Sequence, residues 1–256
     1  MEYKRIVLLA GQWDTTPVVY QFLKRHFSVE KAVIEEPVPR KEFLKRRIKK
    51  LGYLEVAGQV LFQLAIAKPL KKTSAKRIRE IHEQYGLSTA PIPPEDIIAV
   101  PSVNADACLE ILKRLQPDLV IVHGTRIISK KLLRGLSCTF VNIHAGITPR
   151  YRGSHGAYWA LASSDAAHCG VTVHLIDEGI DTGNILAQAT ITPAPADNFS
   201  TYGYLQLAVG LELLKQAIPD LAAGKQPARE TALNSTLWHH PTFWGYLYKR
   251  LTKGVR

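Results

Sequence analysis

Residues Cys138–Thr139–Phe140–Val141–Asn142–Ile143–His144–Ala145–Gly146 form a short apolar run that ends in polar side chains. A run of this length, bounded by glycines on both sides, is typical of a buried strand. Because side chains alternate along a strand, we expect Asn142 and His144 on the same face. Both lie at the carboxyl end of the strand, where open α/β sheets hold their ligands. An amide can donate to a developing oxyanion and an imidazole can carry a proton, so the stretch predicts a catalytic site.

Short aliphatic runs and stretches of helical periodicity alternate on both sides of this strand. The alternation predicts an α/β fold, a Rossmann-like and mostly parallel sheet flanked by helices. The first turn, residues 11–16, has neither G-x-G-x-x-G nor a Walker A lysine, which argues against a nicotinamide or ATP site. We expect strands over 5–10, 32–34, 97–100, 119–122, 138–143, 171–176 and 185–191. We expect helices over 18–26, 105–115, 129–133, 155–161 and 202–218.

The composition is that of a globular protein with a full core. The chain has 256 residues, of which 46% are hydrophobic and 21% charged. Its three cysteines are widely spaced and odd in number, which implies no disulfide framework and favours a reducing compartment. The apolar run near Met1 is too brief for a signal-peptide core, so we expect a cytoplasmic protein.

The net charge of +11 is confined to one segment, 40–79, which holds thirteen Lys or Arg residues and two acids. We expect basic helices over 41–50 and 71–83, and between them an uncharged helix over 56–67 that Pro69 ends. The twelve uncharged residues are too few to cross a bilayer, which takes roughly 20. The segment therefore predicts either a solvated helical surface whose apolar side packs on the sheet, or a patch for phosphates, nucleic acid or a membrane surface.

A second motif, Asp177–Glu178–Gly179–Ile180–Asp181–Thr182–Gly183, follows the predicted strand at 171–176. Together with residues 141–144, the loop 149–153 and Gly170–His174, this motif resembles the folate-dependent formyltransferases. That family includes the glycinamide ribonucleotide, methionyl-tRNA and nucleotide-sugar enzymes. The resemblance covers residues 97–193 and implies the formyltransferase fold. It also implies transfer of a formyl group from 10-formyltetrahydrofolate to a primary amine, with no metal required.

The resemblance also implies roles for individual residues. Asn142 corresponds to the oxyanion donor, His144 to the proton carrier, and Asp181 to the carboxylate that sets the ionisation of the histidine. Two loops are implied to bind the folate, one through its main chain and one by closing over the pterin. For Asp177 a purely structural role in its loop stays open. The implied folate-binding residues are Gly124, Arg126, Ile127, Ile128, Asp177 and Gly179.

Two departures from the family bear on the acceptor. The purine enzyme has a glycine-rich phosphate loop after its first strand, whereas this chain has Gln12–Trp13–Asp14. The tRNA enzyme carries a C-terminal β-barrel domain, whereas about 60 mostly helix-like residues follow Pro193 here. We therefore expect a small, anionic amine acceptor, with a nucleotide- or lipid-linked amino sugar as the leading candidate, and nucleic acid is disfavoured.

We expect a catalytic domain over 1–195, which contains the basic helical segment 40–79, and a short helical C-terminal extension over 196–256. Peripheral membrane contact through 40–79 would make the protein membrane-associated. The aromatic residues of 237–256 favour packing against the core, with dimer or membrane contact as the alternatives. Two other functions stay open: a non-catalytic folate- or nucleotide-binding regulator, and an RNA-binding relative of the formyltransferases. The sequence leaves the oligomeric state unknown.

Overall fold

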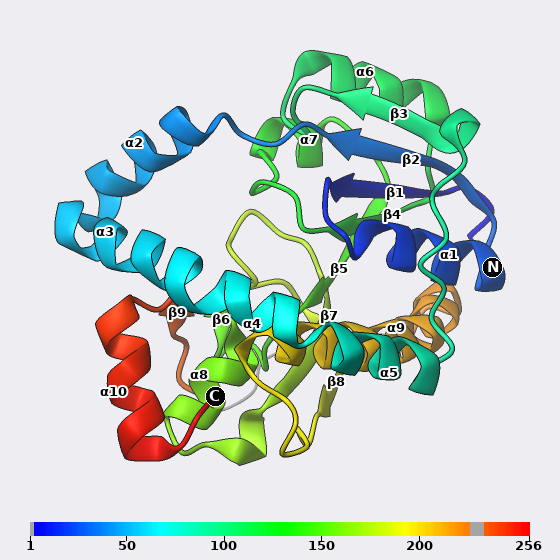
Figure 1. The fold of residues 1–256 in the computed structure, drawn as a ribbon. Helices are drawn as coiled ribbons and strands as arrows, with labels where there is room; N and C mark the ends of the chain where they lie inside the picture. The colour runs from blue at the N-terminus through cyan, green and yellow to red at the C-terminus, as the bar shows by residue number, and fades with distance from the viewer. Residues whose placement is uncertain (1–2, 226–232) are drawn as a thin grey trace.

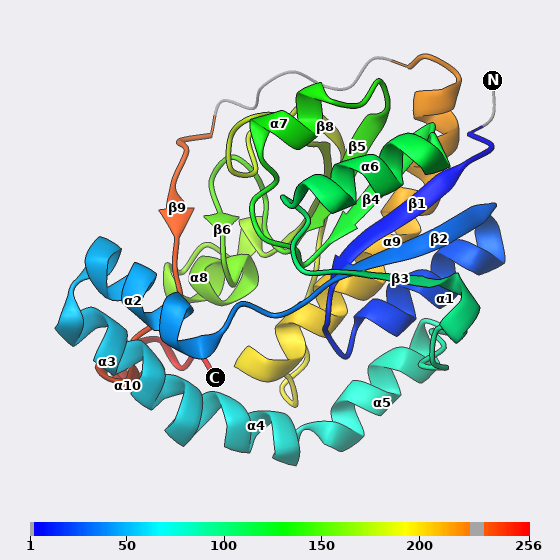
Figure 2. The same cartoon turned by 90° about the horizontal axis from the view of Figure 1, so that it is seen from above.

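The computed structural model describes residues 3–225 and 233–256 and contains a seven-stranded sheet between layers of helices (Figures 1 and 2). The strand order is β3-β2-β1-β4-β5-β7-β8. The first five strands along the chain are parallel, β7 is antiparallel to β5, and β8 is antiparallel to β7. The predicted mostly parallel α/β sheet is therefore confirmed. The strands are β1 (Ile6–Gly11), β2 (Val29–Glu35), β3 (Ile97–Val100), β4 (Leu119–His123), β5 (Thr139–His144), β7 (Gly170–Leu175) and β8 (Ile185–Thr190).

The strand β1 is apolar along its whole length because helices cover both faces of the sheet. Ile6 and Leu8 of β1 pack with α1 (Thr16–His26) and α9 (Phe199–Ala222), whereas Val7 and Leu9 pack with the helices of the opposite face. Those helices are α6 (Asp106–Leu115) and α7 (Lys130–Arg134) (Figure 2). The alternation of side chains along β1 thus separates two cores.

The basic segment is helical, as the sequence predicts, but its boundaries differ. It consists of α2 (Arg40–Leu51), α3 (Tyr53–Phe62), a π-helical turn (Gln63–Ala67), α4 (Lys68–Thr73) and α5 (Ala75–Gln84). The prediction that Pro69 ends a helix is wrong, since Pro69 lies in the first turn of α4. The preceding turn is wider, and its last hydrogen bond runs from the Lys68 N–H to the Gln63 carbonyl. Proline has no N–H to continue the pattern of bonds between residues four apart, and the wider turn is where the backbone departs from that pattern.

The helix α3 packs on other helices, in place of the sheet face that the sequence suggested. Phe62 is fully buried, with its ring centroid 4.8 Å from that of Phe199 and 5.1 Å from that of Tyr246. Tyr246 belongs to α10 (Phe243–Lys253), so the C-terminal aromatic residues close this helical core. The helix α8 (Gly156–Ala162) completes it. Part of the aromatic tail therefore packs internally, as expected.

The C-terminal residues contact the sheet and the loops around it. The helix α9 packs against β5, β7 and β8, and β9 (Leu237–Trp238) pairs in parallel with β6 (Arg152–Gly153). The division between 1–195 and 196–256 stays a prediction. Across 3–225 and 233–256, no helix has both the length and the apolar character needed to span a membrane.

Candidate active site

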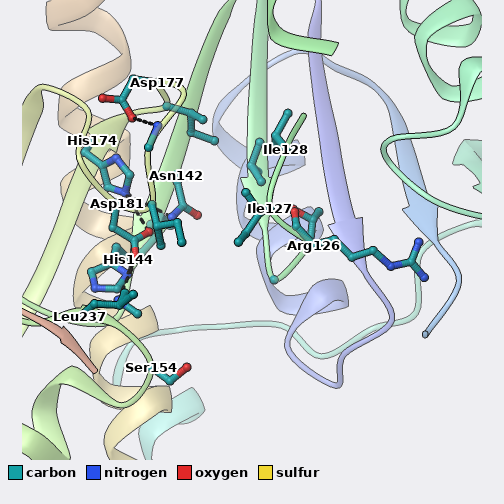
Figure 3. A pocket seen from close by; sticks show the side chains of 18 of the residues that line it. Arg126, Ile127, Ile128, Asn142, His144, Ser154, His174, Asp177, Asp181 and Leu237 are labelled. Atoms are coloured by element: carbon teal, nitrogen blue, oxygen red, sulfur yellow. Dashed lines mark hydrogen bonds and ion pairs between the residues drawn. The ribbon is translucent and has the colours of Figure 1, made fainter. Parts of the chain in front are cut away.

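Strand β5 brings Asn142 and His144 to the wall of a cavity of about 480 Å³ at the carboxyl ends of β4 and β5 (Figure 3). The two residues lie on one face of the strand, as their spacing predicts. Across the antiparallel pair, Asn142 lies opposite His174, and His144 lies opposite Thr172. The order of the strands thus places the polar end of β5 beside a second histidine. We call this space the active-site cavity.

The ring of His144 is buried between two acceptors. Its Nε2 lies 2.7 Å from the carbonyl oxygen of Tyr151, and its Nδ1 lies 3.4 Å from Oδ2 of Asp181. Because a carbonyl oxygen only accepts, Nε2 carries a proton. Nδ1 is therefore the ring atom that can gain or lose a proton beside the carboxylate. Only the imidazolium form can donate toward both acceptors at once.

Asp181 is held in an unusual backbone conformation, with φ of 51°. A non-glycine residue in this left-handed region costs of the order of 1–3 kcal/mol and persists only where its surroundings fix it. Here Oδ2 accepts a 2.9 Å hydrogen bond from the Gly153 main chain, while Oδ1 lies 3.8 Å from Nε2 of His174. The structure therefore brings the three predicted catalytic residues together, and Asp181 faces both histidines.

The sequence prediction missed His174, which holds the amide of Asn142. Its Nδ1 donates to the Leu175 carbonyl at 2.7 Å, and its Nε2 lies 3.3 Å from Nδ2 of Asn142. Burial lowers the pKa of His174, and the neighbouring His144 acts in the same direction. The ring is therefore neutral, and Nε2 accepts one N–H of Asn142, which leaves the other for the cavity. The signal in the sequence was a histidine near the end of the strand beside β5.

The loop with Asp177 and Gly179 forms the polar side of the cavity. Oδ1 of Asp177 accepts from the Gly179 N–H at 2.9 Å and from the Thr182 hydroxyl at 2.7 Å, so the carboxylate closes its own loop (Figure 3). A Cβ at position 179 would collide with the Thr182 hydroxyl. The structural role that the sequence left open for Asp177 is thus present, and both residues also line the cavity.

The second predicted loop, Gly124 to Ile128, forms the opposite wall. The side chain of Arg126 points away from the cavity, and its guanidinium donates to the carbonyls of Pro101 and Glu36 (Figure 3). It also lies 3.3 Å from the buried carboxylate of Glu35, which accepts the Arg126 N–H at 2.6 Å as well. Arg126 therefore contributes its main chain to the wall. The sequence prediction did not identify Glu35, the acid that anchors this loop.

The mouth of the cavity is formed by residues remote from the motifs in sequence. Lys50 comes from α2, and residues 237–239 come from β9 and the chain that follows it. The pairing of β9 with β6 places them beside Gly153 and Ser154, which line the cavity as well. No motif indicated these positions, because they depend on contacts between distant segments.

Two further cavities, of about 410 and 350 Å³, share part of their walls with each other, and the larger one also adjoins the active-site cavity. We call them the outer cavities. The larger shares Gly124, Ile143 and Ser154 with the active-site cavity. Trp13 lines both outer cavities and is 58% exposed. Its Nε1 donates to the Gly124 carbonyl at 2.6 Å. Lys68 and Lys71 line the smaller cavity. The common wall of the outer cavities consists of Trp13, Ala145, His155, Gly203, Tyr204, Gln206 and His240.

The histidines of this region are held neutral. Nε2 of His155 lies 2.8 Å from Nδ1 of His240, so the two rings share one hydrogen bond. Burial is the main cause, and nearby positive charges the second, of the lowered pKa values of both rings. The pKa of His240 falls to about 4, and that of His155 lies well below its usual value. Among the residues the structure describes, no group of three or more His, Cys, Asp or Glu side chains is arranged to hold a metal ion.

Comparison with known proteins agrees with the predicted resemblance. The formyl transferase family model matches residues 67–218, more than half of the chain. Over 142 residues the chain is 33% identical to a methionyl-tRNA formyltransferase from Syntrophus aciditrophicus, which covers 54% of this chain and 45% of the relative. The chain thus spans about half the length of the curated relatives it matches.

Solved structures show the same fold. The phosphoribosylglycinamide formyltransferase from Streptococcus pneumoniae has a TM-score of 0.53 at 20% identity, covering 86% of this chain and 99% of that one. A sugar N-formyltransferase from Shewanella sp. has a TM-score of 0.53 at 16% identity, covering 91% and 77%. At these identities the likeness concerns the fold alone. The match of the family model over 67–218 confirms the predicted family: the chain belongs to the formyl transferases.

Proposed function

We propose that the protein is an N-formyltransferase that moves the formyl group of 10-formyltetrahydrofolate to the primary amine of a small acceptor. The observation that carries this proposal is the convergence of Asn142, His144 and Asp181 on one wall of the active-site cavity (Figure 3). Membership of the formyl transferase family supports the same chemistry.

The active-site cavity suits a flat heterocycle with polar edges, the form of a pterin. Ile127 and Ile128 give it an apolar wall, and the loop from Asp177 to Asp181 gives it a polar one. Its volume of about 480 Å³ lies in the usual range for small-molecule sites, roughly 300–1,000 Å³. We infer that Gly124, Arg126, Ile127 and Ile128 hold the ring mainly through their main chain, with Asp177 and Gly179 opposite.

The side chains of the site can serve each stage of the transfer. Attack by the amine nitrogen on the formyl carbon creates an alkoxide and an ammonium. The second Nδ2–H of Asn142, oriented by His174, donates to the alkoxide. The proton of the ammonium passes through Nδ1 of His144, beside Asp181, to the folate nitrogen as its bond to the formyl carbon breaks. The products are the formamide and tetrahydrofolate, and no metal is required.

The outer cavities are our candidate for the acceptor site, because the larger opens beside Ile143 and Ser154 of the active-site cavity. The half-exposed ring of Trp13 offers a stacking surface for a base or a sugar. Lys68 and Lys71 line the far end and could meet phosphates. These features favour an anionic amino sugar linked to a nucleotide or a lipid carrier.

Methionyl-tRNA is the second candidate acceptor. The curated relatives bear the name of that enzyme, and thirteen basic residues in 40–79 could contact an RNA backbone. The two candidates differ in their dependence on salt. Binding of tRNA through many phosphates weakens steeply as salt rises, whereas transfer to a small acceptor should persist.

The test measures tetrahydrofolate release with 10-formyltetrahydrofolate and a panel of amino-sugar nucleotides, amino sugars on lipid carriers, and methionyl-tRNA. We expect transfer to at least one amino sugar, with Asn142→Ala slowing kcat by about 10²–10³. Asp220→Asn, a surface carboxylate on α9, serves as the control and should leave the rate unchanged. The proposal fails if no amine is formylated and calorimetry detects no folate binding.

A further inference from the structure

The helix α3 exposes an apolar stripe to solvent. Its inner side is buried through Val56, Gln59 and Phe62, whereas its outer side is apolar over three turns. Leu54 is 80% exposed. Single exposed apolar side chains are common, but several of them together on one surface mark a contact with a partner or a membrane. The exposed members of the stripe are Tyr53, Leu54, Val60, Leu61 and, in the π-helical turn, Leu64.

The helix α10 adds a second apolar stripe beside the first. Trp244, Tyr248 and Leu251 follow the i, i+4, i+7 spacing of one helix face, and Leu251 is 85% exposed. The two helices are in contact, since a Cβ at Gly58 of α3 would collide with the Trp244 ring. In both views α2, α3 and α10 lie together at one end of the molecule (Figures 1 and 2). We call this end the docking face.

The two helices that contact α3 at this end, α2 and α10, are both basic. The helix α2 carries seven basic residues and one acid, and α10 carries three basic residues and no acid. Within 3–225 and 233–256, the salt bridges of α2 involve Arg46 alone, which pairs with Glu42. Phe43 and Leu44 of α2 are also exposed, so apolar and basic side chains are interleaved. Long basic side chains around an apolar surface can keep their charges at lipid headgroups while the stripe enters the acyl boundary.

We propose that the docking face binds the surface of an anionic lipid bilayer. Lipid phosphates would neutralise the lysines and arginines, and the stripes of α3 and α10 would insert at the headgroup boundary. A nucleic acid would account for the charge but not for the solvent-facing leucines. A second copy of the chain would account for the leucines, but its own basic segment would repel this one.

The docking face reaches the mouth of the active-site cavity. Lys50, in the last turn of α2, lines that cavity together with Trp238 and His239. A bilayer bound to α2, α3 and α10 would therefore lie close to the cavity mouth. Access of a lipid-linked acceptor from that side rests on the proposed function, whereas the binding of lipid does not.

The experiment measures binding of the full chain to vesicles of phosphatidylcholine alone and of phosphatidylcholine with 30% phosphatidylglycerol. We expect binding to the anionic vesicles only, and its loss as salt rises. Leu54→Ser combined with Leu251→Ser should weaken it at least about tenfold. Lys45→Gln combined with Lys49→Gln should weaken it roughly 25-fold, at about fivefold for each charge. Matched controls on other faces, Ile97→Ser and Lys113→Gln with Arg114→Gln, should bind like the wild type.

A second readout locates the contact. Brominated acyl chains should quench the fluorescence of the protein on anionic vesicles, and Trp244→Phe should remove most of that quenching. Failure to bind either vesicle would overturn the proposal. So would binding to single-stranded RNA that the lysine variant abolishes and the leucine variant leaves intact. Self-association in sedimentation that depends on Leu54 and Leu251, without lipid binding, would overturn it as well.

Discussion

Replacement of His174 by alanine tests how the amide of Asn142 is oriented. In the folded protein Nε2 of His174 lies 3.3 Å from Nδ2 of Asn142, while Nδ1 donates to the Leu175 carbonyl. Because burial lowers the pKa of His174, its Nε2 is an acceptor at neutral pH. Without that acceptor, the side-chain amide of Asn142 stays in the cavity but loses the hydrogen bond that orients it, and with it the direction of its second N–H.

The expected magnitude follows from what is lost. Removal of a whole oxyanion donor costs about 2.7–4 kcal/mol, or 10²–10³ in kcat, and this is the limit expected for Asn142→Ala. His174→Ala removes one neutral hydrogen bond, worth about 0.5–1.5 kcal/mol, so kcat should fall roughly two- to thirteenfold. The KM for the folate co-substrate should change little, since the wall formed by residues 124–128 is untouched.

The assay is tetrahydrofolate release at saturating substrates for His174→Ala, Asn142→Ala and the double variant. If His174 acts through Asn142, the double variant is no slower than Asn142→Ala. His174→Gln, which retains an acceptor oxygen, should recover most of the rate, and His26→Ala on α1 serves as the control. Additive losses in the double variant, in proteins with unchanged melting temperatures, would refute this reasoning.

Three further outcomes are expected. Glu35→Gln leaves the Arg126 guanidinium without its buried charged partner. It should therefore lower the free energy of unfolding by about 3 kcal/mol and raise the KM for folate. An unchanged KM would contradict the role of Glu35 in anchoring the loop. Phe62→Ala should lower the free energy of unfolding by about 3–5 kcal/mol in urea, whereas Leu54→Ala, on the exposed side of α3, should cost little. Burial lowers the pKa of His240 to about 4, from an ordinary value of 6.5. Between pH 4 and 6.5 the unfolded chain therefore binds a proton at His240 that the folded protein does not bind. The stability that is present above pH 6.5 is lost as the pH falls toward 4. The loss is at most about 3 kcal/mol for this ring, and His240→Gln should flatten the dependence measured by urea unfolding.

The fold could be predicted from local patterns of hydrophobic residues in the sequence. Strands and helices alternate with distinct hydrophobic periods, and β1 is aliphatic throughout because both its faces are covered. The predicted helix boundaries were wrong where a local rule, such as the ending of a helix at proline, has exceptions that depend on packing. Pro69 was expected to end a helix, but the π-helical turn before it lets the helical path continue into α4. Whether a turn widens in this way depends on packing, which no local pattern records.

The same division applies to the candidate site. Alternation along one strand is a local property, so the sequence alone placed Asn142 and His144 side by side, and the family motif supplied Asp181. The partners that orient these residues lie elsewhere in the chain: His174 on a neighbouring strand, and Glu35 at the end of β2. Tertiary structure alone turned the Arg126 side chain away from the cavity, and packed α10 as well as α2 against α3 to form the docking face. Such contacts join residues far apart in sequence, and only the packing of the whole chain decides which of them form.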